Sequence, residues 1–290
     1  SYLTIYPEEL RLLLLEKEVF SFYHNSHYVL PRKNRYLMTY KGIRQYHSVI
    51  QEDSYANRQR DKVCHKDGRT YYTTLAGKLL CIIANKAATF DPSGIGIEME
   101  ADKPNWYDAL NGLPGLLGSS ISETLELKRL CIFLLSSFEQ LRLPDKGKVA
   151  VFEELEKFIL DLKNCLEQEK DPLSYWNESN NIKEYYRQCI RGGQVGTDKE
   201  LTVDVIKEFL KLIISKADRA VSGLDKNKLQ PTYFYHHVSE INGDPVRADE
   251  GIINKPSSQE INPASLKFKR HDLPLFLEGF VHALRVERDI

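Results

Sequence analysis

The residues best suited to chemistry gather in one glycine-rich segment, 94–115. Flat aromatic rings stack on sugar rings, amides and carboxylates bind hydroxyl groups, and a carboxylic acid can protonate the oxygen of a leaving group. Glycine lets the backbone approach a ligand closely or turn sharply. The segment therefore has the composition of a carbohydrate subsite, although Gly, Pro, Asp and Asn are also common in ordinary turns. Its candidate side chains are Glu98, Glu100, Asp102, Trp106, Tyr107, Asp108 and Asn111.

The order of these residues resembles a known family. The run Trp106-Tyr107-Asp108-Ala109-Leu110-Asn111-Gly112 resembles the Trp-Asn-Asp-Gly-Met-Asn loop of the cellobiose phosphorylase family and its relatives. The sequel Gly112-Leu113-Pro114-Gly115 and residues 123–130 look like a large, poorly characterised branch of those relatives. The resemblance covers roughly residues 94–130 and is faint elsewhere.

The resemblance implies a fold, a reaction and a set of roles. The fold would be an (α/α)6 helical barrel whose loops surround a sugar pocket. Asp108 would be the general acid of an inverting phosphorolysis, protonating the glycosidic oxygen of a β-linked glucan or disaccharide. Inorganic phosphate, the co-substrate, would attack the anomeric carbon from the opposite face and form a sugar 1-phosphate. No other cofactor is then expected, and the residues implied or expected to bind the sugar are Trp106, Tyr107, Asn111, Glu98 and Glu100.

Two positions depart from the family pattern. Tyr107 stands where the family has Asn, which alters a polar contact near the sugar and leaves the identity of the substrate open. Ala109 stands where the family has Gly, which restricts the backbone if that position requires a positive φ.

A phosphorolytic site must also hold phosphate. The family uses His, Arg, Thr or Ser and backbone amides from later loops, and the candidates here are His236, His237 and Arg191. The adjacent histidines lack the i, i+4 spacing of helical metal ligands, so no metal site is predicted. The glycines that follow Arg191 lack the Lys-Ser/Thr of a P-loop, which argues against a nucleotide site.

Two other functions remain open. An inverting hydrolase or transglycosylase on the same scaffold would need a second carboxylate, Glu98 or Glu100, to activate its nucleophile. A non-catalytic helical fragment that binds sugar or acts as a scaffold would need no acid at all.

Helical periodicity dominates the elements that must position this segment. Apolar side chains recur at helical spacing in 7–23, 73–89, 120–143, 147–168, 202–221 and from Asp272 onward, and Ser120 with Glu123 predicts a capping box. Residues 24–52 read as either a small β-hairpin or an irregular aromatic loop. Residues 223–271 contain four prolines and little periodicity, which predicts a long loop. We therefore expect a mainly α protein, an (α/α)6-type barrel or a fragment of one, with long irregular loops.

Composition bounds the class of protein. The chain has 290 residues, 42% of them hydrophobic, and a formal net charge of −1, which gives no support to a nucleic-acid or anionic-membrane binder. No stretch approaches the roughly 18 apolar residues of a membrane span. Five irregularly spaced cysteines without a CxxC pair fit the reducing cytoplasm rather than a disulfide framework. We expect one α-helical domain over 1–290, excised from the catalytic barrel of a longer polypeptide, with a saccharide and the rest of that polypeptide as partners.

Overall fold

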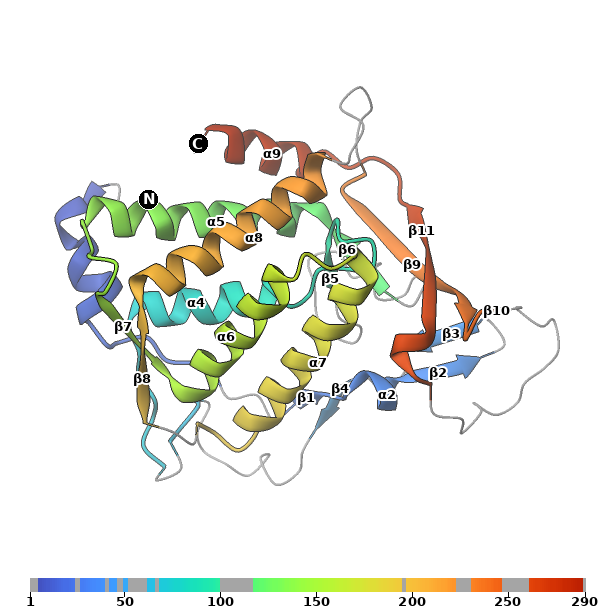
Figure 1. The fold of residues 1–290 in the computed structure, drawn as a ribbon, viewed down its shortest axis with the longest axis horizontal. Coiled ribbons are helices and arrows are strands. Elements are labelled where there is room, and N and C mark those ends of the chain that lie inside the picture. Colours follow the sequence, from blue (N-terminus) through green and yellow to red (C-terminus); the bar gives the residue numbers. More distant parts are fainter. Residues whose placement is uncertain are drawn as a thin grey trace.

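The chain folds into a mixture of helices and sheets (Figure 1). The computed structural model describes residues 5–23, 27–39, 42–45, 49–51, 62–65, 68–99, 117–194, 197–222, 231–246 and 261–288. Of these, 52% are helical and 26% extended, and the strands form four sheets. The expectation of a mainly α, (α/α)6-type barrel is therefore wrong.

Most helices form where the apolar periodicity predicts them. The predicted ranges 73–89, 120–143 and 202–221 become α4 (Leu75–Ala87), α5 (Ile121–Gln140) and α8 (Val203–Ser222). In 147–168 only the later part is helical, as α6 (Glu153–Glu167), because the first residues form strand β7 (Lys148–Phe152). The Ser120 side chain makes no capping hydrogen bond, and Glu123 instead forms an ion pair with Lys86.

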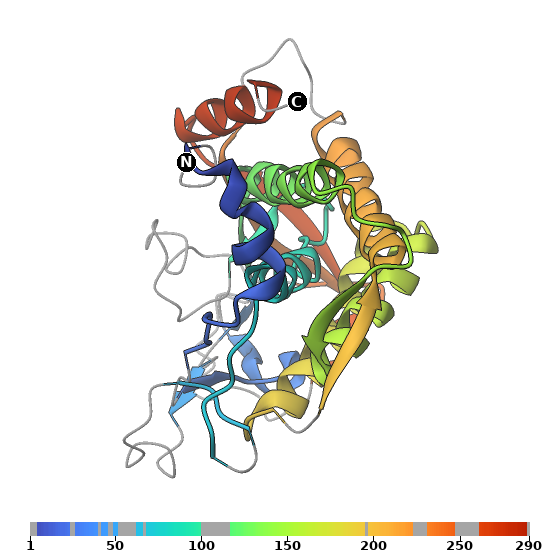
Figure 2. The same cartoon turned by 90° about the vertical axis from the view of Figure 1, so that its left-hand side faces the viewer.

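Both ends of the helical pattern differ from expectation. The N-terminal prediction shrinks to η1 (Pro7–Glu9) and a π-helix, η2 (Leu12–Glu16). These turns bury Leu10 and Leu14 and cross one side of the molecule beside α4 (Figure 2). Asp272 ends a strand rather than starting a helix, and the last helix, α9 (Glu278–Arg288), begins six residues later and packs on α5.

Helix α7 (Pro172–Ile190) was not predicted. It begins at Asp171, whose carboxylate accepts the Ser174 N–H at 3.1 Å, and Pro172 occupies the first helical position. The helix buries Tyr175, Trp176 and Tyr186, so it belongs to the framework of the molecule.

The largest sheet has five antiparallel strands: β5 (Ile97–Met99), β6 (Leu117–Ser120), β9 (Tyr233–Ile241), β10 (Asp244–Pro245) and β11 (Leu266–Asp272). β5 pairs with β6, β6 pairs with β9, and β11 pairs along β9. The region predicted as a long loop, 223–271, thus supplies most of this sheet. Its strand β9 buries Phe234, His236 and Val238 and leaves the side chains between them partly exposed, the period of two expected of a strand.

The other sheets are two-stranded. β2 (Tyr36–Thr39) and β3 (Gly42–Gln45) form a hairpin within 24–52, which confirms that reading of the segment. β1 (His27–Val29) pairs with β4 (Val49–Gln51), and β7 pairs with β8 (Asp198–Thr202). The short helical pieces α2 (Arg32–Arg35) and η4 (Pro263–Ser265) lead into β2 and β11.

Two apolar cores hold these elements together. The main core lies among α4, α5, α6, α8 and the inner side of α7, and includes the buried Cys81, Cys131 and Cys165. A second core joins the β2–β3 hairpin and the five-stranded sheet to α7 through Tyr36, Ile43, Leu117, Trp176 and Val238. Within the described ranges, no helix is long and apolar enough to cross a membrane.

Candidate functional site

The segment that carries most of the candidate residues, 100–116, lies outside the described residues. That segment contains Glu100, Asp102, Trp106, Tyr107, Asp108 and Asn111. Its two ends are described, because β5 ends at Met99 and β6 begins at Leu117. Met99 and Gly118 are partners in adjacent antiparallel strands, so the segment leaves and re-enters the fold at one place.

The strand register places particular side chains beside that point. Gly118 pairs with Tyr235 on β9, and Tyr235 pairs with His271 on β11. Met99, Gly118, Tyr235 and His271 therefore form one row across the sheet. Residues directly opposite in neighbouring strands point to the same face. The base of the candidate segment thus shares a row and a face with an aromatic and an imidazole side chain.

An aromatic and imidazole cluster occupies this face. The His271 ring stacks on Tyr235 at 4.9 Å and on His237 at 4.6 Å between ring centres. His271 Nε2 and His237 Nδ1 lie 2.6 Å apart, so one imidazole donates a hydrogen bond to the other. We call Tyr235, His237 and His271 the outer cluster.

The surroundings of the outer cluster are positive. Partial burial lowers the pKa of His237 below its ordinary value, and His271, Lys269 and Arg44 lower it further. Burial also lowers the pKa of Arg44, which comes from the β2–β3 hairpin, although a guanidinium stays charged. Two cations beside a hydrogen-bonded imidazole pair suit an anionic ligand, and the imidazoles can donate to or accept from its oxygens.

The opposite face of the sheet holds Glu98. This side chain is 5% exposed, and its Oε2 accepts the Trp176 indole N–H at 3.0 Å. The Arg32 guanidinium lies 4.7 Å from the centre of the Trp176 ring, and Arg32 itself is held by an ion pair with Glu184 at 3.5 Å. Glu98 therefore ties β5 to α7 and fixes the strand from which the candidate segment departs.

His236 lies on this buried face as well, separated from its neighbour His237 by the alternation of β9. It is 1% exposed and packs edge-on against Phe234 and Phe268. Among the described residues neither of its ring nitrogens has a hydrogen-bond partner. Burial lowers its pKa, so the imidazole is neutral near pH 7. His236 and His237, which the sequence predicts together as phosphate ligands, thus lie on opposite faces of the sheet.

Arg191 lies with neither the outer cluster nor the residues of the buried face, Glu98 and His236. It follows the end of α7, about four turns and 22 Å along the helix from Trp176, and its guanidinium lies 3.9 Å from the Tyr28 ring centre. The residues that do flank His237, namely Arg44, Lys269 and His271, were missed. The alternation of buried and exposed side chains in β9 and β11 could have shown that His237 and His271 fall on exposed positions. No local feature of the sequence indicates that these two histidines contact each other.

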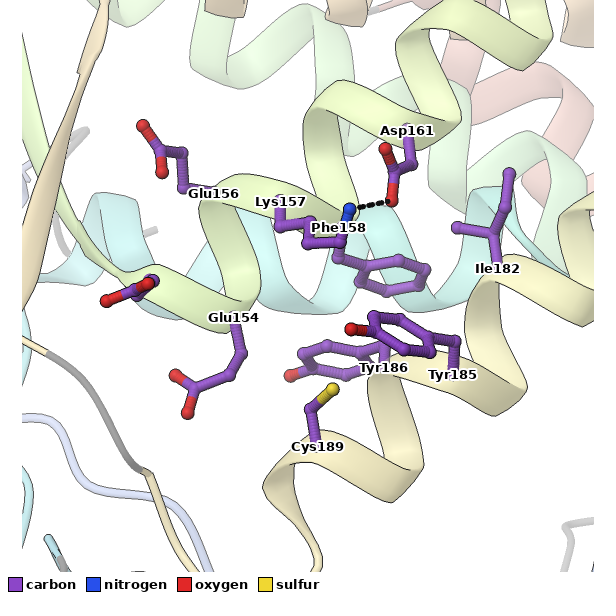
Figure 3. Close-up of a pocket in the computed structure, with 10 residues that line it drawn as sticks. Glu154, Glu156, Lys157, Phe158, Asp161, Ile182, Tyr185, Tyr186 and Cys189 are labelled. Atoms are coloured by element: carbon purple, nitrogen blue, oxygen red, sulfur yellow. Dashed lines mark ion pairs between the residues drawn. The ribbon is translucent and has the colours of Figure 1, made fainter.

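A hollow of about 380 Å³ lies between α6 and α7 (Figure 3). It is lined by carboxylates and aromatic rings, including Glu154, Glu156 and Tyr185. Helix packing accounts for much of the lining, because Lys157 and Asp161 form an ion pair at 3.2 Å and Phe158 stacks on Tyr186 at 4.3 Å. It contains none of the sequence candidates, so the outer cluster remains the better site.

Comparison with protein-family models and with curated proteins finds no match to this chain. Among the described residues, no group of three or more His, Cys, Asp or Glu side chains is placed to hold a metal ion. The functional argument therefore rests on the candidate segment and on the groups beside its base.

Proposed function

We propose that this chain is a carbohydrate-active catalytic domain that cleaves a β-glycosidic bond by inverting phosphorolysis. Asp108 donates its proton to the glycosidic oxygen, an oxygen of inorganic phosphate attacks the anomeric carbon from the other face, and the bond to the leaving sugar breaks. The products are a sugar 1-phosphate and a shortened saccharide. Trp106, Tyr107 and Asn111 bind the sugar.

One observation carries this proposal: the row Met99–Gly118–Tyr235–His271 puts the base of the 100–116 segment beside the outer cluster, which two cations flank. Neighbouring strands lie about 4.8 Å apart, so Met99 and His271 are separated by roughly 14 Å across the sheet. An extended chain covers about 3.3 Å per residue, and Asp108 is therefore within reach of the outer cluster.

The charges beside the outer cluster match the second substrate, inorganic phosphate. Phosphate carries one to two negative charges near pH 7, and Arg44 and Lys269 attract it while His237 and His271 hydrogen-bond its oxygens. Since phosphate is the nucleophile, the site needs no carboxylate base.

The surroundings of Glu98 disfavour the hydrolytic alternative that uses it. A base that activates water must reach that water, whereas Glu98 is buried and its Oε2 is bonded to Trp176. Hydrolysis would then depend on Glu100 alone. We also place the enzyme in the cytoplasm, where its five free cysteines would stay reduced.

The test is to incubate the chain with β-linked gluco-oligosaccharides, with and without phosphate, and to follow sugar 1-phosphate by ³¹P NMR. We expect product only with phosphate. Asp108→Asn should lower the rate at least about a hundredfold, the usual contribution of a general acid. Asp145→Asn is the matched control, because Asp145 is exposed and pairs only with Lys207 among the described residues. Free sugar released without phosphate would support the hydrolase, and an inert chain the non-catalytic alternative.

A further inference from the structure

A second hollow, of about 410 Å³, opens where three segments meet. The turn 93–95 forms one wall, the residues that lead into α7 form another, and the C-terminal part of α8 forms the third. Its volume lies in the range of small-molecule sites. It shares no residue with the outer cluster or with the 100–116 segment, so the proposed function makes no use of it.

The lining of this hollow is positively charged. Among the described residues it contains Lys170, Lys216 and Arg219 but only one carboxylate, Glu169. Lys170 forms an ion pair with Glu178, and Arg219 forms one with Glu169 at 3.3 Å. The Arg219–Glu169 pair is more than half exposed on both sides, and such pairs contribute little to stability, so Arg219 can turn toward a ligand at small cost.

Lys216 is the unusual member of the lining. Its ammonium lies 3.7 Å from the Tyr175 ring centre and 5.1 Å from that of Phe90, and no carboxylate within the described part of the chain forms an ion pair with it. Burial, and then Arg219, lower the pKa of Lys216 to about 8. A partly buried amine held only against aromatic faces is stabilised by an arriving anion.

The nearest buried carboxylate does not fill this role. Asp91 is fully buried, and its oxygens accept hydrogen bonds from the backbone N–H groups of Ser93, Ile95 and Gly96. Its charge stabilises the ammonium of Lys216 from a distance, but its oxygens are committed to the turn. The amides of the turn are committed as well, so recognition falls to the three basic side chains.

We propose that this hollow is a binding site for a small phosphomonoester, with Lys216 as the central contact and Lys170 and Arg219 on either side. A phosphate dianion would balance the excess positive charge of the lining. Lys216 would donate hydrogen bonds to the phosphate oxygens, and Arg219 would bind them through its planar guanidinium.

Pyridoxal 5′-phosphate is a suitable probe, because it joins a phosphomonoester to an aldehyde. The neutral Lys216 amine attacks the aldehyde carbon, water leaves and an imine forms. Borohydride then adds hydride to that carbon, solvent supplies the proton, and the stable secondary amine can be located by peptide mapping. We expect Lys216 to be labelled at least tenfold faster than Lys211, an exposed lysine on the same helix.

Three comparisons decide the proposal. Inorganic phosphate should slow labelling of Lys216, pyridoxal without its phosphate should label Lys216 more slowly than pyridoxal 5′-phosphate does, and Arg219→Gln should slow labelling of Lys216 alone. Equal rates for the two reagents at Lys216, or no protection by phosphate, would overturn the site. His237→Ala separates this proposal from the catalytic one: it should abolish phosphorolysis and leave the labelling and protection of Lys216 unchanged.

Discussion

The hydrogen bond between Trp176 and Glu98 gives a stability prediction whose size follows from the structure. Trp176 is fully buried and Glu98 nearly so, and Trp176→Phe removes the donor that lies 3.0 Å from the carboxylate. A hydrogen bond to a charged group contributes about 1.5–3 kcal/mol. The smaller ring adds about 1 kcal/mol for lost packing. We expect the variant to lose about 2.5–4 kcal/mol of unfolding free energy.

A double-mutant cycle isolates the hydrogen bond from the packing. Glu98→Gln keeps the shape and an acceptor oxygen but removes the charge, and a neutral hydrogen bond contributes only about 0.5–1.5 kcal/mol. Trp176→Phe should therefore cost about 1 kcal/mol less in the Glu98→Gln background. Urea unfolding followed by circular dichroism at pH 7 measures all four proteins. Equal costs in the two backgrounds would refute the reasoning.

Other predictions concern the same sheet. Because burial lowers the pKa of His236 in the folded chain, the unfolded chain binds more protons as the pH falls below about 6.5, and stability should fall with it. In His236→Leu that loss, measured by urea unfolding between pH 5 and 8, should be smaller; an unchanged slope would contradict the role of His236. Gly96→Ala should lose about 1–3 kcal/mol, since a Cβ there would lie 2.7 Å from the Phe234 ring. Thermal unfolding should show little change for Gly192→Ala, where a Cβ meets nothing within 4 Å; similar losses in both variants would count against the packing argument.

The helices that the sequence predicts correctly are those whose stability depends on an apolar stripe. In α6 the stripe of Leu155, Phe158, Ile159 and Leu162 is entirely buried, so the local apolar pattern is enough to identify both the helix and its buried face. The five residues before α6 are extended because they pair with β8, a contact between segments about fifty residues apart. Local periodicity cannot report such a pairing.

Helix α7 was missed because its buried face is not apolar. Along with its aromatic residues it buries Ser179, Asn180 and Lys183. Ser179 donates to the backbone oxygen of Ala88, and Asn180 to that of Trp176. Ala88 is brought to Ser179 only by the fold, whereas Trp176 lies one turn before Asn180 in the same helix. Because the buried face includes these polar side chains, it leaves no hydrophobic period in the sequence. The Asp171-Pro172 start was the one local indication.

The candidate site, too, could be predicted from the sequence only in part. The order of residues around Asp108 suggests a chemistry, and His237 is the predicted phosphate ligand of β9 that lies on the same face as the Met99–Gly118–Tyr235–His271 row. The partners of His237 come from β3 and β11, and no sequence spacing relates Arg44 to His271. His236 and Arg191 were selected by residue type alone, and the pleat of β9 and the length of α7 carry them elsewhere.

The measurement that tests the central proposal most directly is the configuration of the product formed from a β-linked gluco-oligosaccharide and phosphate. Inverting phosphorolysis must give the α-anomer of the sugar 1-phosphate, which the anomeric proton coupling in ¹H NMR identifies. We expect the α-anomer from the unmodified chain and from Asp145→Asn, and at least about a hundredfold slower formation of product by Asp108→Asn. A β-anomer, or undiminished product from Asp108→Asn, would contradict the proposal.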